Sequence, residues 1–74
     1  MTFKQLLADT LEQLDRVLDN STDEDRSEAY RLIEGEPSAG PVGVYYLTDY
    51  ICYQISFEGV ALTEIAAALR QADL

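Results

Sequence analysis

The 74-residue sequence contains neither histidine nor tryptophan, and its only cysteine is Cys52. A lone cysteine cannot form a disulfide within the chain, and without histidine the common zinc ligand sets cannot be assembled. A serine or cysteine nucleophile would also lack its usual base, so we interpret Cys52 as a small core hydrophobe. We therefore expect a non-enzymatic protein with no catalytic residue, no metal site and no cofactor.

Positive charge is scarce: five Lys and Arg residues stand against 14 Asp and Glu residues, which gives a net charge of −9. Binding to nucleic acid depends on basic side chains that replace phosphate counterions, and anionic membrane surfaces repel an acidic protein. The charge favours association with basic surfaces instead. We therefore expect a protein partner with a basic surface, no direct contact with nucleic acid and no membrane.

Long apolar runs are also missing, since no stretch approaches the ~18 residues of a membrane-spanning helix. The N-terminal residues follow a helical pattern and do not resemble a signal peptide. We expect a cytoplasmic protein whose residues 1–74 form a single small acidic domain. A chain this short buries only about 60–65% of its unfolded surface, so it needs good helix packing or a partner.

Two helices are predicted in the first half of the chain. Thr2 and Gln5 have capping-box spacing ahead of an apolar stripe. Two pairs, Thr22 with Asp25 and Ser21 with Glu24, offer the same spacing before a second helix that ends near Gly35. We expect the two helices to pair as an antiparallel hairpin, with the stripe facing a core. The stripe consists of Phe3, Leu6, Leu7, Leu11, Leu14, Val17 and Leu18.

Residues 43–59 hold most of the aromatic side chains and fit two patterns. Their β-branched and aromatic composition favours strand, and a hairpin at 42–57 would give one consistently apolar face. As a helix ending at Gly59, the same residues place Tyr46, Tyr50 and Tyr53 on one stripe with Phe57. Tyr50 discriminates, because it shares a side with Tyr46 only in the helix.

The helical interpretation is favoured by the end signals and by the helical pattern of residues 62–71 that follow. The predicted fold class is therefore mainly α, a small antiparallel bundle of about four helices. The alternative is an α+β fold with the order α-α-β-β-α and the hairpin at 42–57.

Two features are candidate partner-binding surfaces. Residues 9–36 carry ten carboxylates against three arginines, and the second feature is the aromatic stripe. Each also has a plainer explanation, since the charge can serve solubility and the aromatic rings can form the core. The candidate residues are Asp15, Asp19, Asp23, Glu24 and Glu28 for charge, and Tyr46, Tyr50, Tyr53 and Phe57 for apolar contact.

The leading functional prediction is a small inhibitor, adaptor or regulator that binds another protein. A narrower version is a viral protein that mimics nucleic acid. Phages use small acidic proteins of this kind to inhibit nucleases or CRISPR-type complexes. The alternative is a structural or assembly subunit that homo-oligomerises, for example as a homodimer, through the tyrosine-rich segment.

Overall fold

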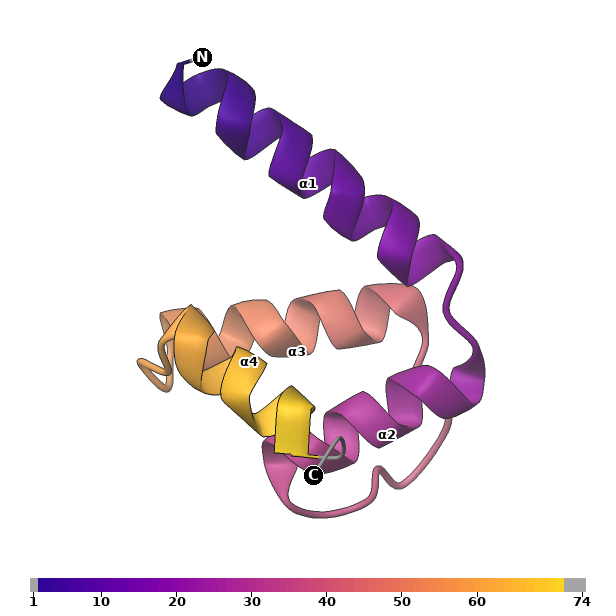
Figure 1. The fold of residues 1–74 in the computed structure, drawn as a ribbon. Coiled ribbons are helices and arrows are strands. Elements are labelled where there is room, and N and C mark those ends of the chain that lie inside the picture. Colours follow the sequence, from indigo (N-terminus) through magenta and orange to yellow (C-terminus); the bar gives the residue numbers. More distant parts are fainter. Residues whose placement is uncertain (1, 72–74) are drawn as a thin grey trace.

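Four helices make up the computed structural model, which describes residues 2–71 (Figure 1). They are α1 (Phe3–Asp19), α2 (Asp23–Glu34), α3 (Val44–Ser56) and α4 (Leu62–Arg70). The described residues contain no strand. The prediction of a small bundle of about four helices is confirmed, and the alternative with a hairpin at 42–57 is wrong.

The capping box predicted for α1 is present, and of the two pairs that could cap α2, Thr22 with Asp25 forms the box. The Thr2 amide donates to the side chain of Gln5 at 3.0 Å, and the Gln5 amide donates back to the Thr2 hydroxyl at 3.2 Å. Thr22 and Asp25 repeat this exchange at 3.1 and 3.0 Å. Each box satisfies two backbone amides that have no partner within their helix. The starts of α1 and α2 are therefore encoded locally.

Two glycines turn the chain at the ends of the middle helices. Gly35 has φ 91° at the end of α2, and Gly59 has φ 68° shortly after α3. Left-handed backbone favours glycine because it has no Cβ. The following helix, α4, begins at Leu62, where the amide of Ala61 donates to Glu64 at 3.4 Å.

Contacts with α2 explain why α3 is helical despite its strand-forming composition. The Tyr30 ring of α2 lies 4.6 Å from the ring of Tyr50 and 6.0 Å from that of Tyr46, measured between centroids. The Tyr50 hydroxyl also donates a hydrogen bond to Glu34. Tyr46 and Tyr50 therefore share one side, as the helical prediction requires. These tertiary contacts outweigh the local preference for strand.

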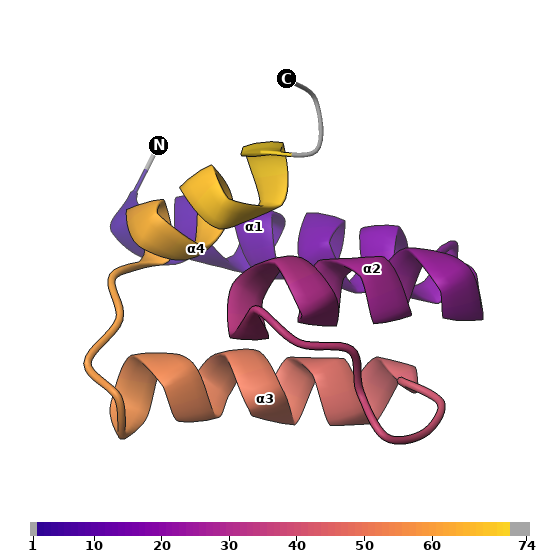
Figure 2. The same ribbon diagram turned by 90° about the horizontal axis from the view of Figure 1, so that it is seen from below.

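Helix α2 is the centre of the packing and contacts both α3 and α4 (Figure 2). The buried apolar residues of the described chain are Val42, Leu47 and Ile65. They come from the loop before α3, from α3 and from α4. We refer to α2, α3, α4 and their connections as the body.

Helix α1 leans away from the body towards its N-terminal end (Figure 1). None of its residues is buried. The radius of gyration is 13.0 Å, whereas a compact chain of this length is expected to have about 11 Å. The chain does reverse direction between α1 and α2, but the two helices splay apart. The prediction that the apolar stripe of α1 faces a core is therefore wrong for the single chain.

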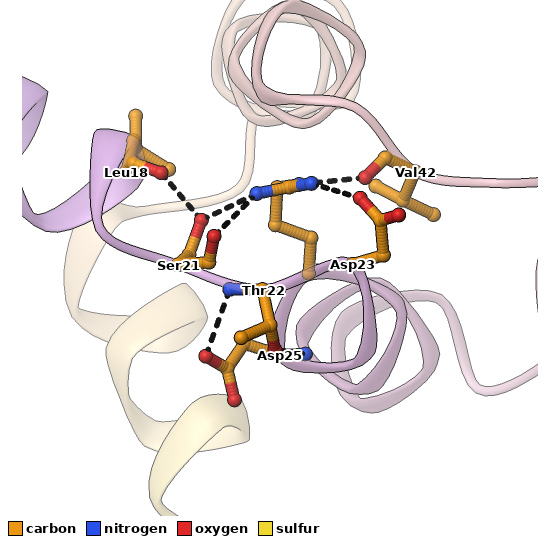
Figure 3. A network of polar contacts seen from close by, with 7 residues as sticks. Leu18, Ser21, Thr22, Asp23, Asp25 and Val42 are labelled. Atoms are coloured by element: carbon orange, nitrogen blue, oxygen red, sulfur yellow. Dashed lines mark hydrogen bonds and ion pairs between the residues drawn. The ribbon is translucent and has the colours of Figure 1, made fainter.

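A buried arginine fixes the start of the body. The Arg26 guanidinium donates to the backbone carbonyl of Val42 at 2.7 Å and to the carbonyl and hydroxyl of Ser21 at 2.9 and 2.8 Å. It also forms an ion pair with Asp23. Figure 3 shows Ser21, Asp23 and Val42 converging from the α1–α2 turn, the start of α2 and the loop before α3. One side chain therefore joins three segments of the chain.

Candidate protein-binding surfaces

The predicted aromatic stripe forms a surface on α3. Tyr46 and Tyr53 are about half exposed and Phe57 is 80% exposed. The rings of Tyr53 and Phe57 stack with centroids 5.2 Å apart and an angle of 21° between their planes. Tyr50 is less exposed, because it packs on Tyr30. We call Tyr46, Tyr50 and Tyr53 of α3, together with Phe57 directly after the helix, the α3 aromatic face.

Carboxylates accompany this face. Partial burial and the hydrogen bond to Glu34 raise the pKa of Tyr50 above its ordinary value. The nearby Glu58 carboxylate raises the pKa of Tyr53. Residues 32–69 contain five carboxylates and no lysine or arginine, so α3 has no basic neighbours in sequence. The α3 aromatic face is therefore apolar with an acidic margin.

The predicted acidic residues do not join the aromatic face in one site. Asp15 and Asp19 lie on α1, and the others lie in the first half of α2. Glu24 and Glu28 instead line an open hollow of about 370 Å³ against the loop at 37–40. The five carboxylates named from the sequence are thus divided between two helices.

Arginines neutralise part of this acidic set. Asp23 pairs with Arg26, and Glu28 pairs with Arg31. The hydrogen bond from Arg31 lowers the pKa of Glu28, and the same contact raises the pKa of Arg31. Two of the five predicted carboxylates therefore already have a cationic partner within the chain.

Helix α1 provides a second surface, although its apolar periodicity predicts a core position. Its exposed apolar side chains are between 44% and 74% accessible, and we call them the α1 apolar face. The periodicity did identify these residues, but it carries no information on what covers them. The α1 apolar face consists of Phe3, Leu6, Leu7, Leu11, Leu14 and Val17.

A groove of about 230 Å³ continues the α1 apolar face onto the body, and we call it the α1 groove. Leu14 and Val17 form one wall, and Ile33, Ile51 and Leu69 are among the residues of the other. A further hollow of about 230 Å³ shares Leu14 and extends towards the start of α3. Both hollows involve the C-terminal half of α1, so the N-terminal half projects without support.

Cys52 is exposed, so its interpretation as a core residue is wrong. Within residues 2–71, His, Cys, Asp and Glu side chains form no group of three that could hold a metal ion. The helices of this region are too short or too polar to cross a membrane.

Comparisons with family models, curated proteins and solved structures find no match to this chain. The two surfaces themselves are therefore the evidence for function. One is aromatic with an acidic margin, and the other is a purely apolar helix face that continues into a groove.

Proposed function

We propose that the protein is a non-enzymatic protein-binding module that docks through the α3 aromatic face onto a basic segment of its partner. Such a module acts as an inhibitor, adaptor or regulator of the protein that it binds. The observation that carries the proposal is the exposed Tyr53–Phe57 stack, which lies in a stretch of 38 residues, 32–69, with carboxylates and no basic side chain.

Aromatic side chains suit this role because they bury a large area and lose little conformational freedom. Tyrosine is enriched at interfaces, where its ring packs and its hydroxyl remains hydrogen-bonded. A lysine or arginine over an exposed ring contributes about 0.5–2 kcal/mol. The carboxylates of Glu34 and Glu58, which interact with Tyr50 and Tyr53, would favour the same cations. The rings and the carboxylates therefore both favour a partner segment that carries apolar and basic side chains.

The remaining carboxylates have a supporting role in this proposal. Asp15, Asp19 and Glu24 add to a negative field that accelerates encounter with a basic protein and weakens with salt. Asp23 and Glu28 contribute less, because Arg26 and Arg31 offset their charge. A row of phosphate-like charges is therefore interrupted on α2. For this reason we favour docking through the aromatic face over nucleic-acid mimicry, which remains an outcome of the test.

The test is affinity capture from cell lysate with the tagged protein, followed by mass spectrometry, at about 0.1 and 0.5 M salt. We expect the wild-type chain to retain a basic partner at low salt and to lose most of it at high salt, because the Debye length shortens. The variant Tyr53→Ser/Phe57→Ser should lose the partner at both salt concentrations, since central aromatic anchors dominate binding energy.

The matched control is Tyr45→Ser, which removes an 85% exposed ring from α3 outside the α3 aromatic face. This control should capture the partner as the wild type does. Capture that ignores both salt and the Tyr53/Phe57 substitutions would contradict the proposal. Competition by duplex DNA, together with a loss of binding when Asp15 and Glu24 become neutral, would instead support mimicry.

A further inference from the structure

The single chain exposes more surface than a compact protein of its size. Its accessible surface is 5848 Å², whereas a compact monomer of this mass is expected to expose about 4,600 Å². The excess of about 1,200 Å² is larger than the ~800 Å² that each partner buries in a standard interface. The exposed surface is therefore large enough to hold an interface of standard size.

The α1 apolar face is a main source of this excess. Its six side chains together expose on the order of 600 Å², the upper end for the largest apolar patch on a typical monomer. In proteins most of the stability of an amphipathic helix comes from the packing of its apolar face. The α1 apolar face therefore requires a cover to keep α1 helical.

We propose that a second copy of the chain covers it, with the two α1 helices packed antiparallel about a two-fold axis near Leu11. Leu11 is the midpoint of α1, so this register places the N-terminal half of one α1 beside residues 14–18 of the other. Leu6 and Leu7 of each copy then enter the α1 groove of its partner, beside Leu14 and Val17. The projecting N-terminal half of each α1 therefore packs against the C-terminal half of the other α1, which borders the α1 groove.

The composition of the α1 apolar face favours a second copy over the basic partner of the α3 aromatic face. The face itself carries no charge, so it does not select a cation. Its best complement is another amphipathic helix with the same apolar stripe, which α1 provides. A two-fold pairing also fills both grooves at once and leaves no α1 apolar face open, so assembly stops at the dimer.

Charge and dipole favour the antiparallel direction. In helical projection, Lys4 and Asp15 lie on the same flank of the stripe. In an antiparallel pair about Leu11, Lys4 of one copy lies across from the Asp15 region of the other, and the reciprocal contact forms by symmetry. The helix macrodipoles also oppose each other in this arrangement. Each copy then offsets part of the negative charge of its partner.

The first test measures mass in solution by sedimentation equilibrium between about 1 and 100 µM. We expect twice the chain mass at the upper end. Leu11→Glu should shift the equilibrium to monomer by at least tenfold in Kd, because it buries a charge at the two-fold axis. The charge-matched control Arg16→Gln, on the outer side of α1, should remain a dimer. Helicity measured at the same concentrations shows whether Leu11→Glu has unfolded.

The second test maps the pairing directly and does not depend on a destabilising change. In a Cys52→Ser background, single cysteines are introduced by Leu11→Cys, Phe3→Cys or Glu12→Cys and treated with a mild thiol oxidant. We expect a reducible covalent dimer from Leu11→Cys, because the two copies of this position lie close together at the axis. Phe3→Cys places its thiols at opposite ends of the pair, and Glu12→Cys points outward, so neither should cross-link.

Three results overturn the inference. A wild-type chain that is monomeric at 100 µM excludes the dimer. Efficient cross-linking of Phe3→Cys indicates a parallel pair, and a dimer that survives Leu11→Glu but not Tyr53→Ser/Phe57→Ser places the interface on the α3 aromatic face. Because the substitutions of α1 leave that face intact, failure of this inference and failure of the proposed function are distinguishable.

Discussion

Helix α1 and the body are stabilised in different ways. Helix α1 has the clearest amphipathic pattern of the chain and a complete capping box, yet none of its residues is buried. Helix α3 has a strand-like composition, yet Tyr50 on Tyr30 and the buried Leu47 hold it in the body. The comparison shows that local signals determine where a helix starts, whereas long-range contacts determine whether it is packed.

The largest effect on the body is expected from Arg26→Ala. The substitution leaves the carbonyls of Val42 and Ser21 without their donor, and an unsatisfied buried group costs about 1–3 kcal/mol. We expect a loss of about 3 kcal/mol in the free energy of unfolding, which lowers Tm by more than ~10 °C in a domain of this size. Thermal unfolding followed by circular dichroism measures it.

The control for this variant is Arg31→Ala, which removes an arginine that pairs with Glu28 on the surface of α2. Exposed ion pairs contribute less than ~1 kcal/mol, so this variant should unfold within a few degrees of the wild type. Equal losses for the two variants would show that the Arg26 contacts do not hold the body together.

The sequence predicts the ends of the helices well, because their signals are local. Thr2, Thr22 and Gly35 each act within one turn of the backbone that they stabilise. The burial of Arg26 could not be predicted, since its acceptors on Ser21 and Val42 are 21 positions apart and only the fold brings them together.

For the two candidate surfaces too, the sequence predicts local features but does not predict which side chains are covered. Periodicity correctly placed Tyr46 and Tyr50 on one side of a helix. It also identified the apolar side of α1, but it could not distinguish a face that packs within the chain from one that a second copy covers. The exposure of Cys52 escaped prediction for a related reason, because composition alone does not specify which side of α3 is covered.

A smaller change in the free energy of unfolding is expected from Tyr50→Phe, and the sign of this change depends on pH. Loss of the hydrogen bond to Glu34 should cost about 1 kcal/mol at pH 7. The pKa of Tyr50 is raised in the folded state above 10.0, so folding favours the protonated phenol. This contribution is complete below pH 10 and is lost as the pH rises further.

Urea unfolding at pH 7, 9 and 11 measures this effect. Tyr50→Phe should be less stable than wild type at pH 7 and should lose less stability between pH 9 and 11, because phenylalanine does not ionise. Tyr45→Phe, which alters an exposed ring, should follow the wild type at each pH. A constant difference between Tyr50→Phe and wild type at all three pH values would contradict the proposed linkage.

The most direct test of the difference between α1 and the body is amide hydrogen exchange at two protein concentrations, about 1 and 200 µM. If a second copy covers α1, its amides should be protected at 200 µM and exchange quickly at 1 µM, because dilution separates the dimer. The amides of α2 and α3 should retain their protection at both concentrations. Protection of α1 that does not change on dilution would contradict the account.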